Sequence, residues 1–185
     1  MNRPLRLRGV AASVGVAIGP AQILGLEGTA FACERVDPSD VGAELARFQE
    51  AVARSREEIE KAKQELMRRH GPTYAPILDV YLLMHGDALL IDAVGESIRS
   101  DCINAEWAVA RVTERLREPL LRDDSSYFRE RARDIAHVND QLLRHLSGAP
   151  SVKPPKEGPG VLIAHDMAPS DAVRMLAPPT ACLLY

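Results

Sequence analysis

The sequence predicts a mostly α-helical protein with a smaller α/β part: four helices in two helical hairpins, inserted into a discontinuous and incomplete α/β unit. Ala, Leu, Arg and Glu dominate the middle of the chain, and aromatic residues make up only 4% of it, a balance that favours packed helices. An apolar seam with alternating spacings of four and three runs through residues 41–66. Segments typical of strands lie at both ends, so the helices are expected to interrupt one sheet-containing unit.

The length, net charge and cysteines of the chain indicate which classes of function are not expected for it. The chain has 185 residues, 46% of them apolar, which suffices for a core in one ordinary domain or two small ones. A formal net charge of −3 provides no basic surface for nucleic acid or an anionic membrane, so neither is expected as a partner. Cys33, Cys102 and Cys182 are odd in number and far apart, which indicates free thiols in the reducing cytoplasm.

The first segment is expected to form sheet rather than an export signal. Arginines precede the apolar run 10–18, but Gly15, Gly19 and Pro20 interrupt this part of the chain. No stretch reaches the ~20 apolar residues that cross a bilayer, so no membrane anchor is expected. Val14–Pro20 instead has the pattern of a short strand and turn.

The first helix is expected to begin after Asp37, which can cap it, with Pro38 in its first turn. It should run to about Arg69, a length of roughly 48 Å at ~1.5 Å per residue, which suits a helical hairpin. Its buried seam is expected to be Val41, Leu45, Phe48, Val52, Ser55, Ile59, Ala62 and Leu66.

Three more helical segments follow. The second begins after His70-Gly71-Pro72 and runs past Leu82, with Gly86 as a kink or break. Asn104 is expected to cap the third, and Gly148 to end the fourth, which begins after residues 123–126. The expected buried sides are Ala105, Val109, Val112, Leu116 and Leu120 on the third helix, and Phe128, Ala132, Ile135, Val138, Leu142 and Leu146 on the fourth.

The last part of the chain alternates strand and helix. A linker rich in Pro, Lys and Gly spans residues 150–160. Val161–Ala164 and Ala181–Tyr185 are expected as strands, and Asp166–Leu176 as a helix with Pro169 in its first turn. The resulting division is 1–36 for the first piece of the α/β subdomain, 37–148 for the helical subdomain and 149–185 for the second piece.

Three motifs resemble the amino-terminal region of Enzyme I, the phosphoenolpyruvate-protein phosphotransferase of the bacterial sugar phosphotransferase system. The opening Arg8–Ala21 resembles a G-x-x-x-S-x-G-x-A-x-G pattern, Tyr127–Ile135 resembles Y-x-x-E-R-x-x-D-[IV], and Val161–Ala172 resembles a segment with the pattern V-x-[IV]-A-x-D-x-x-P-S. Each motif alone is weak, but three in order at compatible spacings cover nearly the whole chain. The resemblance implies a transferase, with a kinase-like passage of phosphate from phosphoenolpyruvate via a phosphohistidine to the phosphocarrier HPr.

The resemblance also implies where the chemistry would lie. In Enzyme I a Gly-Gly-x-x-S-H-T loop carries the phosphoryl-accepting histidine, and by the register of the motifs this loop would follow Tyr185. The sites for phosphoenolpyruvate and Mg²⁺ would lie in a C-terminal barrel of a homodimeric full-length protein. The 185 residues are therefore expected to be inactive by themselves, to contain no catalytic residue, cofactor or metal, and only to dock HPr.

The docking surface implied by the resemblance comprises the second helix, its break and the start of the last helix. The matching positions are Pro72, Thr73, Pro76, Tyr81, Leu83, Met84, Asp87, Ala88, Leu89, Leu90, Phe128 and Arg131. Leu83, Met84, Leu90 and Phe128 have a competing interpretation as core residues. Several positions that are often glutamate in Enzyme I are Pro72, Thr73, Ala88 and Leu89 in this sequence, so electrostatic steering of a basic partner should be weak; Asp79, Asp87 and Asp92 would compensate only in part.

Two alternatives remain open at the level of sequence. One is an Enzyme I-like region of a multiphosphoryl carrier, such as the phosphotransferase subunit of a dihydroxyacetone kinase. The other is a helical-hairpin interaction module without phosphoryl chemistry, which the apolar seam alone would permit. His165 lies between an expected strand and helix, but no glycine pair or hydroxyl precedes it, so a loop histidine is favoured over a phosphoryl acceptor.

Overall fold

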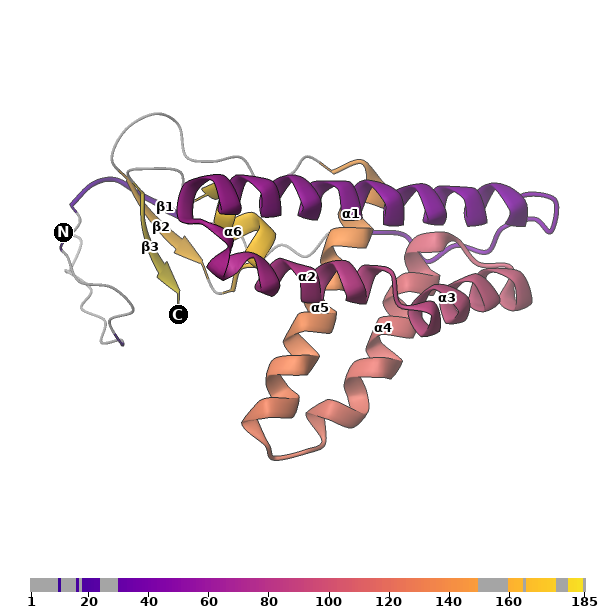
Figure 1. Cartoon of the computed structure of the whole chain (residues 1–185). Coiled ribbons are helices and arrows are strands. Elements are labelled where there is room, and N and C mark those ends of the chain that lie inside the picture. The colour runs from indigo at the N-terminus through magenta and orange to yellow at the C-terminus, as the bar shows by residue number, and fades with distance from the viewer. Residues whose placement is uncertain are drawn as a thin grey trace, which may run out of the picture.

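The computed structural model describes residues 10, 16, 18–23, 30–149, 160–164, 166–175 and 180–184. The described elements are mostly helices, with a small parallel sheet at one end (Figure 1). α1 packs against α2, and α4 packs against α5, so the two expected hairpins are present. The main core lies among α1, α3, α4 and α5, and a second cluster of Ile59, Ala62, Leu78 and Tyr81 lies between α1 and α2.

Helix α1 spans Val41–His70, and the predicted seam faces the core. Phe48 and Ile59 are buried completely, and Val41, Leu45 and Leu66 pack at the margins of the two clusters. The predicted start was too early, because the Asp37 carboxylate accepts hydrogen bonds from the backbone N–H and the hydroxyl of Ser39 and so closes a turn. Asp40 is the N-cap residue instead.

The second predicted helix is two helices, α2 (Ala75–His85) and α3 (Ala88–Asp101), preceded by a short 3-10 helix, η1 (Pro72–Tyr74). The region expected to hold four helices therefore holds five. The break falls at Gly86, as predicted, and the Asp87 side chain caps α3 by accepting a hydrogen bond from the backbone N–H of Leu89 at 2.9 Å.

Helices α4 (Ala105–Leu121) and α5 (Ser126–Ser147) form a hairpin whose far end projects from the rest of the bundle (Figure 1). Asn104 caps α4, and Gly148 ends α5 with a left-handed backbone (φ 65°), both as predicted. The prediction that Leu116 and Phe128 are buried is wrong. Both lie near the projecting end, where Leu116 is 40% exposed and Phe128 is 38% exposed. Few other elements reach this end of the hairpin to cover them.

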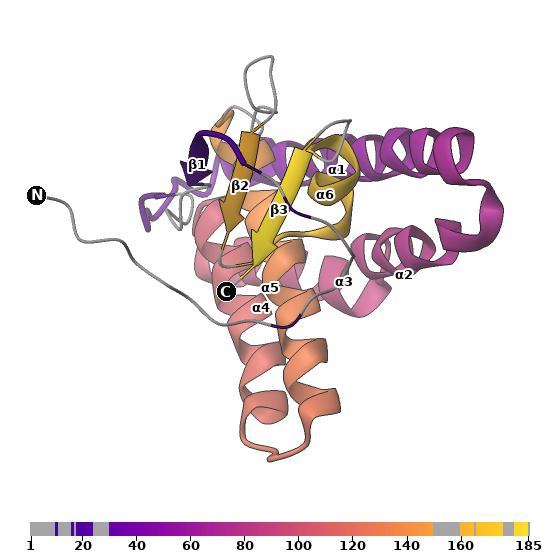
Figure 2. The ribbon, with the colours of Figure 1, turned by 90° about the vertical axis from the view of Figure 1, so that its left-hand side faces the viewer.

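The sheet unites the two ends of the chain. β1 (Ala21–Ile23) pairs in parallel with β2 (Gly160–Ala164), which pairs in parallel with β3 (Thr180–Leu184). The strands lie side by side in the order β1-β2-β3, with α6 (Pro169–Met175) next to them (Figure 2). The predicted strands near 161–164 and 181–185 are confirmed, whereas α6 begins at Pro169 rather than Asp166. The predicted 14–20 strand is not confirmed: residues 16 and 18–20 are not in a strand, residues 14, 15 and 17 lie outside the described residues, and the strand of this segment is β1, which begins at Ala21. Most of the predicted 150–160 linker lies outside the described residues, and the division at residues 36 and 148 stays a prediction.

A cluster of charged side chains joins the two hairpins to α6. The Glu58 carboxylate on α1 meets Arg144 and His145 of α5 at 3.4 and 2.9 Å and also pairs with Arg174 of α6. Burial would raise the pKa of Glu58, but the hydrogen bond to His145 and the charges of the two arginines outweigh it and lower the pKa to about 2. Glu58 therefore stays ionised at neutral pH and fixes α6 to the helices.

None of the described helices is both long enough and apolar enough to cross a membrane. Cys33 and Cys102 are free thiols. The side chain of Cys182 is not among those that the structure describes. The prediction of three free thiols is therefore confirmed for Cys33 and Cys102 and stays a prediction for Cys182.

Candidate functional site

The candidate docking residues lie on η1, α2, the start of α3 and the start of α5. α2 crosses α5 (Figure 1), and Tyr81 connects the two helices. Its hydroxyl donates a hydrogen bond of 2.7 Å to Asp134 Oδ1 on α5. The crossing therefore brings together segments that are about fifty positions apart in the sequence.

The structure separates the twelve candidate residues by exposure. Tyr81 and Leu90 are each only 6% exposed, so they lie behind the surface and not on it. For Leu90 the core interpretation is therefore confirmed. Met84 and Arg131 are half-buried. The exposed members are Pro72, Thr73, Pro76, Leu83, Asp87, Ala88, Leu89 and Phe128.

An apolar stripe follows one face of α2. Pro76, Val80 and Leu83 are spaced four and three positions apart, so they share a face, and all three are exposed. Leu83 is 74% exposed and Leu89, just beyond the break, is 77% exposed. Val80 was not among the predicted residues, although its spacing from Pro76 and Leu83 was a usable signal. Four exposed apolar side chains on α2 and at the start of α3 suit a contact surface.

At the start of α5 an arginine lies against an aromatic pair. The Tyr127 and Phe128 rings meet edge to face with centroids 5.5 Å apart, and the Arg131 guanidinium carbon lies 5.4 Å from the Tyr127 centroid. Arg131 Nη1 also pairs with Asp134 Oδ2 at 2.9 Å. Tyr127, which is 59% exposed, belongs to this group although only Phe128 and Arg131 were predicted. Aromatic residues and arginine are the types that most often anchor protein interfaces.

The acidic residues near the surface are mostly engaged within the chain. Asp87 caps α3, and Asp79 forms an ion pair with Lys63 at 2.6 Å. Asp92 is exposed on α3. The weak electrostatic steering expected from the sequence is consistent with these contacts, so the exposed apolar groups would carry most of any docking energy.

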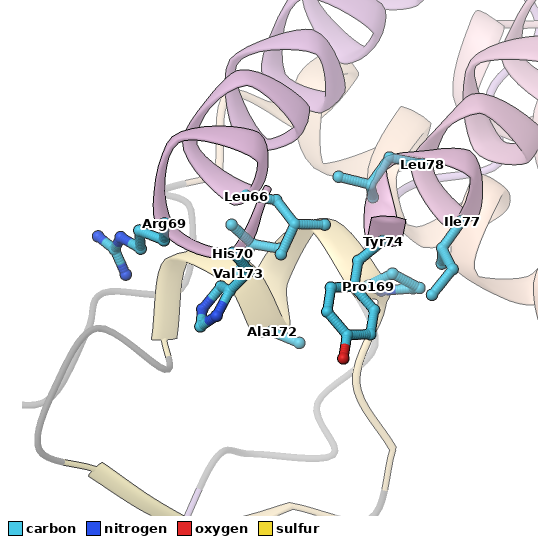
Figure 3. A pocket seen from close by; sticks show the side chains of 9 residues that line it. All are labelled: Leu66, Arg69, His70, Tyr74, Ile77, Leu78, Pro169, Ala172 and Val173. Atoms are coloured by element: carbon cyan, nitrogen blue, oxygen red, sulfur yellow. The ribbon is translucent and has the colours of Figure 1, made fainter. Parts of the chain in front are cut away.

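A separate pocket of about 260 Å³ lies between the end of α1, the start of α2 and α6 (Figure 3). Its lining is mainly apolar and comprises Leu66, Arg69, His70, Tyr74, Ile77, Leu78, Pro169, Ala172 and Val173. Arg69 is paired with Glu65 and points away from the cavity in Figure 3. The other polar side chains of the lining are His70 and Tyr74, so the pocket is mainly an apolar packing space with one imidazole and one phenol at its wall.

The comparisons with known proteins agree with this fold. Residues 8–131 match the family model described as "PEP-utilising enzyme, N-terminal". The chain belongs to this family. This PEP-utilising enzyme N-terminal domain is 36% identical over 170 residues to a phosphoenolpyruvate-protein phosphotransferase of Bacillus subtilis. The matched region covers 91% of this chain and 30% of that relative. A protein of the same name from Geobacillus stearothermophilus is 34% identical over 174 residues, 94% of this chain and again 30% of the relative.

This PEP-utilising enzyme N-terminal domain thus spans about a third of the length of the curated relatives it matches. Among solved structures, the solution structure of Enzyme I (nEIt) is similar with a TM-score of 0.74 and 34% identity, over 92% of this chain and 69% of that one. The N-terminal domain of Enzyme 1 - Nitrogen, at 22% identity and a TM-score of 0.66, shares the fold over 91% of this chain and 79% of its own. The mostly helical fold with a parallel sheet is the one predicted.

Proposed function

We propose that this chain is the amino-terminal, partner-docking part of a phosphoenolpyruvate-protein phosphotransferase and that it binds the phosphocarrier HPr. The whole protein would pass a phosphoryl group from phosphoenolpyruvate through a histidine to HPr in sugar uptake. Family membership and the names of the matched relatives support this proposal. They favour it over a multiphosphoryl carrier or a helical-hairpin module without phosphoryl chemistry.

The observation that carries the proposal is the set of exposed side chains around the α2–α5 crossing. Leu83 and Leu89 offer apolar area from α2 and α3, and Phe128 offers an aromatic face from α5. Arg131 adds a planar guanidinium that can donate forked hydrogen bonds to a carbonyl or, during transfer, to the phosphoryl group. An apolar centre with an arginine beside it is the usual composition of an energetically important docking site.

The residues of this chain would act by holding the partner and not by bond making. Phosphoryl transfer between histidines needs a neutral imidazole nucleophile in line with the phosphorus atom, so precise docking supplies much of the catalysis. No group of three or more His, Cys, Asp or Glu that could hold a metal occurs among the described residues. On the resemblance to Enzyme I, and not on this absence, we propose that the phosphoenolpyruvate and Mg²⁺ sites and the reactive histidine lie in other parts of the whole protein.

A titration of isotope-labelled HPr tests the proposal. Phe128→Ala and Arg131→Ala are each expected to weaken binding about tenfold or more, because each removes an anchor group worth more than about 1 kcal/mol. Circular dichroism should show unchanged helix content, since Phe128 is 38% exposed and not part of the core.

Arg54→Ala is the matched control for loss of a surface arginine. Arg54 lies on α1 and is exposed, and Glu50 at 2.5 Å is its only ion-pair partner among the described residues, so its loss should leave the HPr affinity unchanged. A wild-type chain that does not bind HPr would refute the proposed function. Folded Phe128 and Arg131 variants that bind as tightly as the wild type would refute the surface.

A further inference from the structure

Beneath the proposed surface, one carboxylate joins two helices. Asp134 on α5 uses Oδ2 to pair with Arg131 Nη1 at 2.9 Å and Oδ1 to accept the hydroxyl proton of Tyr81 at 2.7 Å. The side chain of Asp134 is 17% exposed, whereas that of Arg131 is 42% exposed. The exposed arginine is therefore held by a carboxylate that is itself held by a residue of α2.

The same tyrosine continues the network toward the sheet-containing part. Tyr81 Oη lies 3.3 Å from His137 Nδ1, and the two rings are stacked with an interplanar angle of 26°. His137 Nε2 lies 3.2 Å from Asp166 Oδ2, in the segment that leads into α6. The shorter of the two contacts of Tyr81 assigns its proton to Asp134.

The tyrosine hydroxyl keeps its proton under ordinary conditions. Burial, followed by the hydrogen bond to Asp134, raises the pKa of Tyr81 well above its usual range. The hydroxyl is thus a permanent donor to Asp134 Oδ1. In a partly buried setting such a donor fixes the rotation of the carboxylate more firmly than water would.

The fixed carboxylate limits what Arg131 can do within the chain. Oδ1 accepts from Tyr81 while Oδ2 pairs with Arg131 Nη1 at 2.9 Å, so the two contacts use different oxygens and together hold the carboxylate in one orientation, with a single oxygen toward the guanidinium. Arg131 Nε is buried without a hydrogen-bond partner among the described residues, so a partner would reach the 42% exposed guanidinium through its Nη groups, and the Tyr127 ring 5.4 Å away supports its face. Without the tyrosine hydroxyl, both carboxylate oxygens could turn toward Arg131 and withdraw it from the surface.

We propose that Tyr81 and Asp134 are positioning residues that set Arg131 for docking, with Tyr81 acting on Arg131 only through the Asp134 carboxylate. This inference rests on the proposed function, because it assigns roles behind the same surface. It differs from the implied role of Tyr81 as a contact residue, since a side chain that is 6% exposed cannot reach a partner.

A double-mutant cycle with labelled HPr tests this dependence. Tyr81→Phe is expected to weaken HPr binding about 3- to 10-fold, within the usual range for coupled neighbours. Arg131→Ala is expected to weaken it more. The double variant should bind no more weakly than Arg131→Ala alone, because Tyr81 has no effect once Arg131 is absent. If Tyr81 had a merely structural role, the loss of HPr affinity in the double variant would equal the sum of the losses in the two single variants, expressed as free energies.

A second readout does not need the partner. The guanidinium ¹H–¹⁵N resonances of Arg131 in the free chain should shift in Tyr81→Phe and also in Asp134→Asn, which keeps the shape of the side chain. Thr113→Val is the matched control, because it removes a buried hydroxyl bound to Asn139 of α5 at 2.9 Å, away from Arg131. It should move neither these resonances nor the HPr affinity.

The outcomes separate the two proposals. Failure of the wild-type chain to bind HPr would refute the proposed function, while the Arg131 resonances would still report on the network. If the wild type binds and Tyr81→Phe binds equally well, or the two substitutions add independently, the positioning role is refuted and the docking function stands. If Tyr81→Phe lowers the helix content, the Asp134→Asn cycle with Arg131→Ala replaces it with the same expectation.

Discussion

Phe48→Ala and Ile59→Ala are each expected to lower the free energy of unfolding by about 2–5 kcal/mol, through lost burial and the cavity left behind. Phe48 is 1% exposed and Ile59 is fully buried. They belong to different clusters, Phe48 to the main core and Ile59 to the cluster between α1 and α2. The two substitutions therefore test both halves of the seam of α1.

Urea unfolding followed by circular dichroism measures these losses. Arg54→Ala, on the exposed face of the same helix, should change the free energy of unfolding by no more than about 0.5 kcal/mol. Equal losses at core and surface positions would show that the helix faces the core with a different side from the one described.

Acidification from pH 6.5 to pH 4 is expected to cost about 3 kcal/mol of stability through His85 alone, at 1.36 kcal/mol per pKa unit. His85 is fully buried, with Nδ1 2.8 Å from the Tyr81 carbonyl oxygen, and its Nε2 has no partner among the described residues. Burial lowers its pKa from 6.5 to about 4, although the contact with the Tyr81 carbonyl opposes this. Between these two values the unfolded chain binds a proton that the folded chain does not, so stability falls as the pH falls.

The variant His85→Leu should abolish this part of the pH dependence, because leucine fills a similar volume without titrating. Free energies of unfolding at pH 7 and pH 4 would show the difference between wild type and variant. Glu58 affects the wild type and the variant alike, because its pKa is about 2 in the folded chain and its contribution to stability is lost mainly below its ordinary pKa of 4.5. His70→Leu, at the exposed end of α1, controls for the loss of an imidazole. The same fall in stability in wild type and His85→Leu would contradict the assignment.

Local signals in the sequence were sufficient for the long helices. The seam of α1, the Asn104 cap and the Gly148 end depend on residues a few positions apart, and such patterns are legible along a chain. α2 was different. It is apolar nearly all round, with Ile77, Leu78, Val80, Leu82 and Leu83 within seven positions, so periodicity could not show which side faces the core. Only the packing of α2 against its neighbours shows that Tyr81 lies behind the surface and that Val80 lies on it.

The remaining differences arise from contacts between distant residues. Glu58 meets Arg144 and Arg174 across 86 and 116 positions, and no local pattern predicts such a cluster. Leu116 and Phe128 satisfy the helical pattern of buried residues, yet they lie near the projecting end of the α4–α5 hairpin, where little covers them. The spacing of apolar residues shows which face of a helix can be buried. Whether that face is buried depends on how far the neighbouring helices extend along it.

The pairing of β1 with β2 fixes the order in which the chain can fold. Ala21 pairs with Val161, and closing an unstructured loop of about 140 residues costs about 4 kcal/mol or more in chain entropy. The helical hairpins between these strands form from contacts much closer in sequence, so they can assemble quickly and bring the two strands near each other. The helices should therefore acquire protection from hydrogen exchange first during refolding, and the amides of the sheet last.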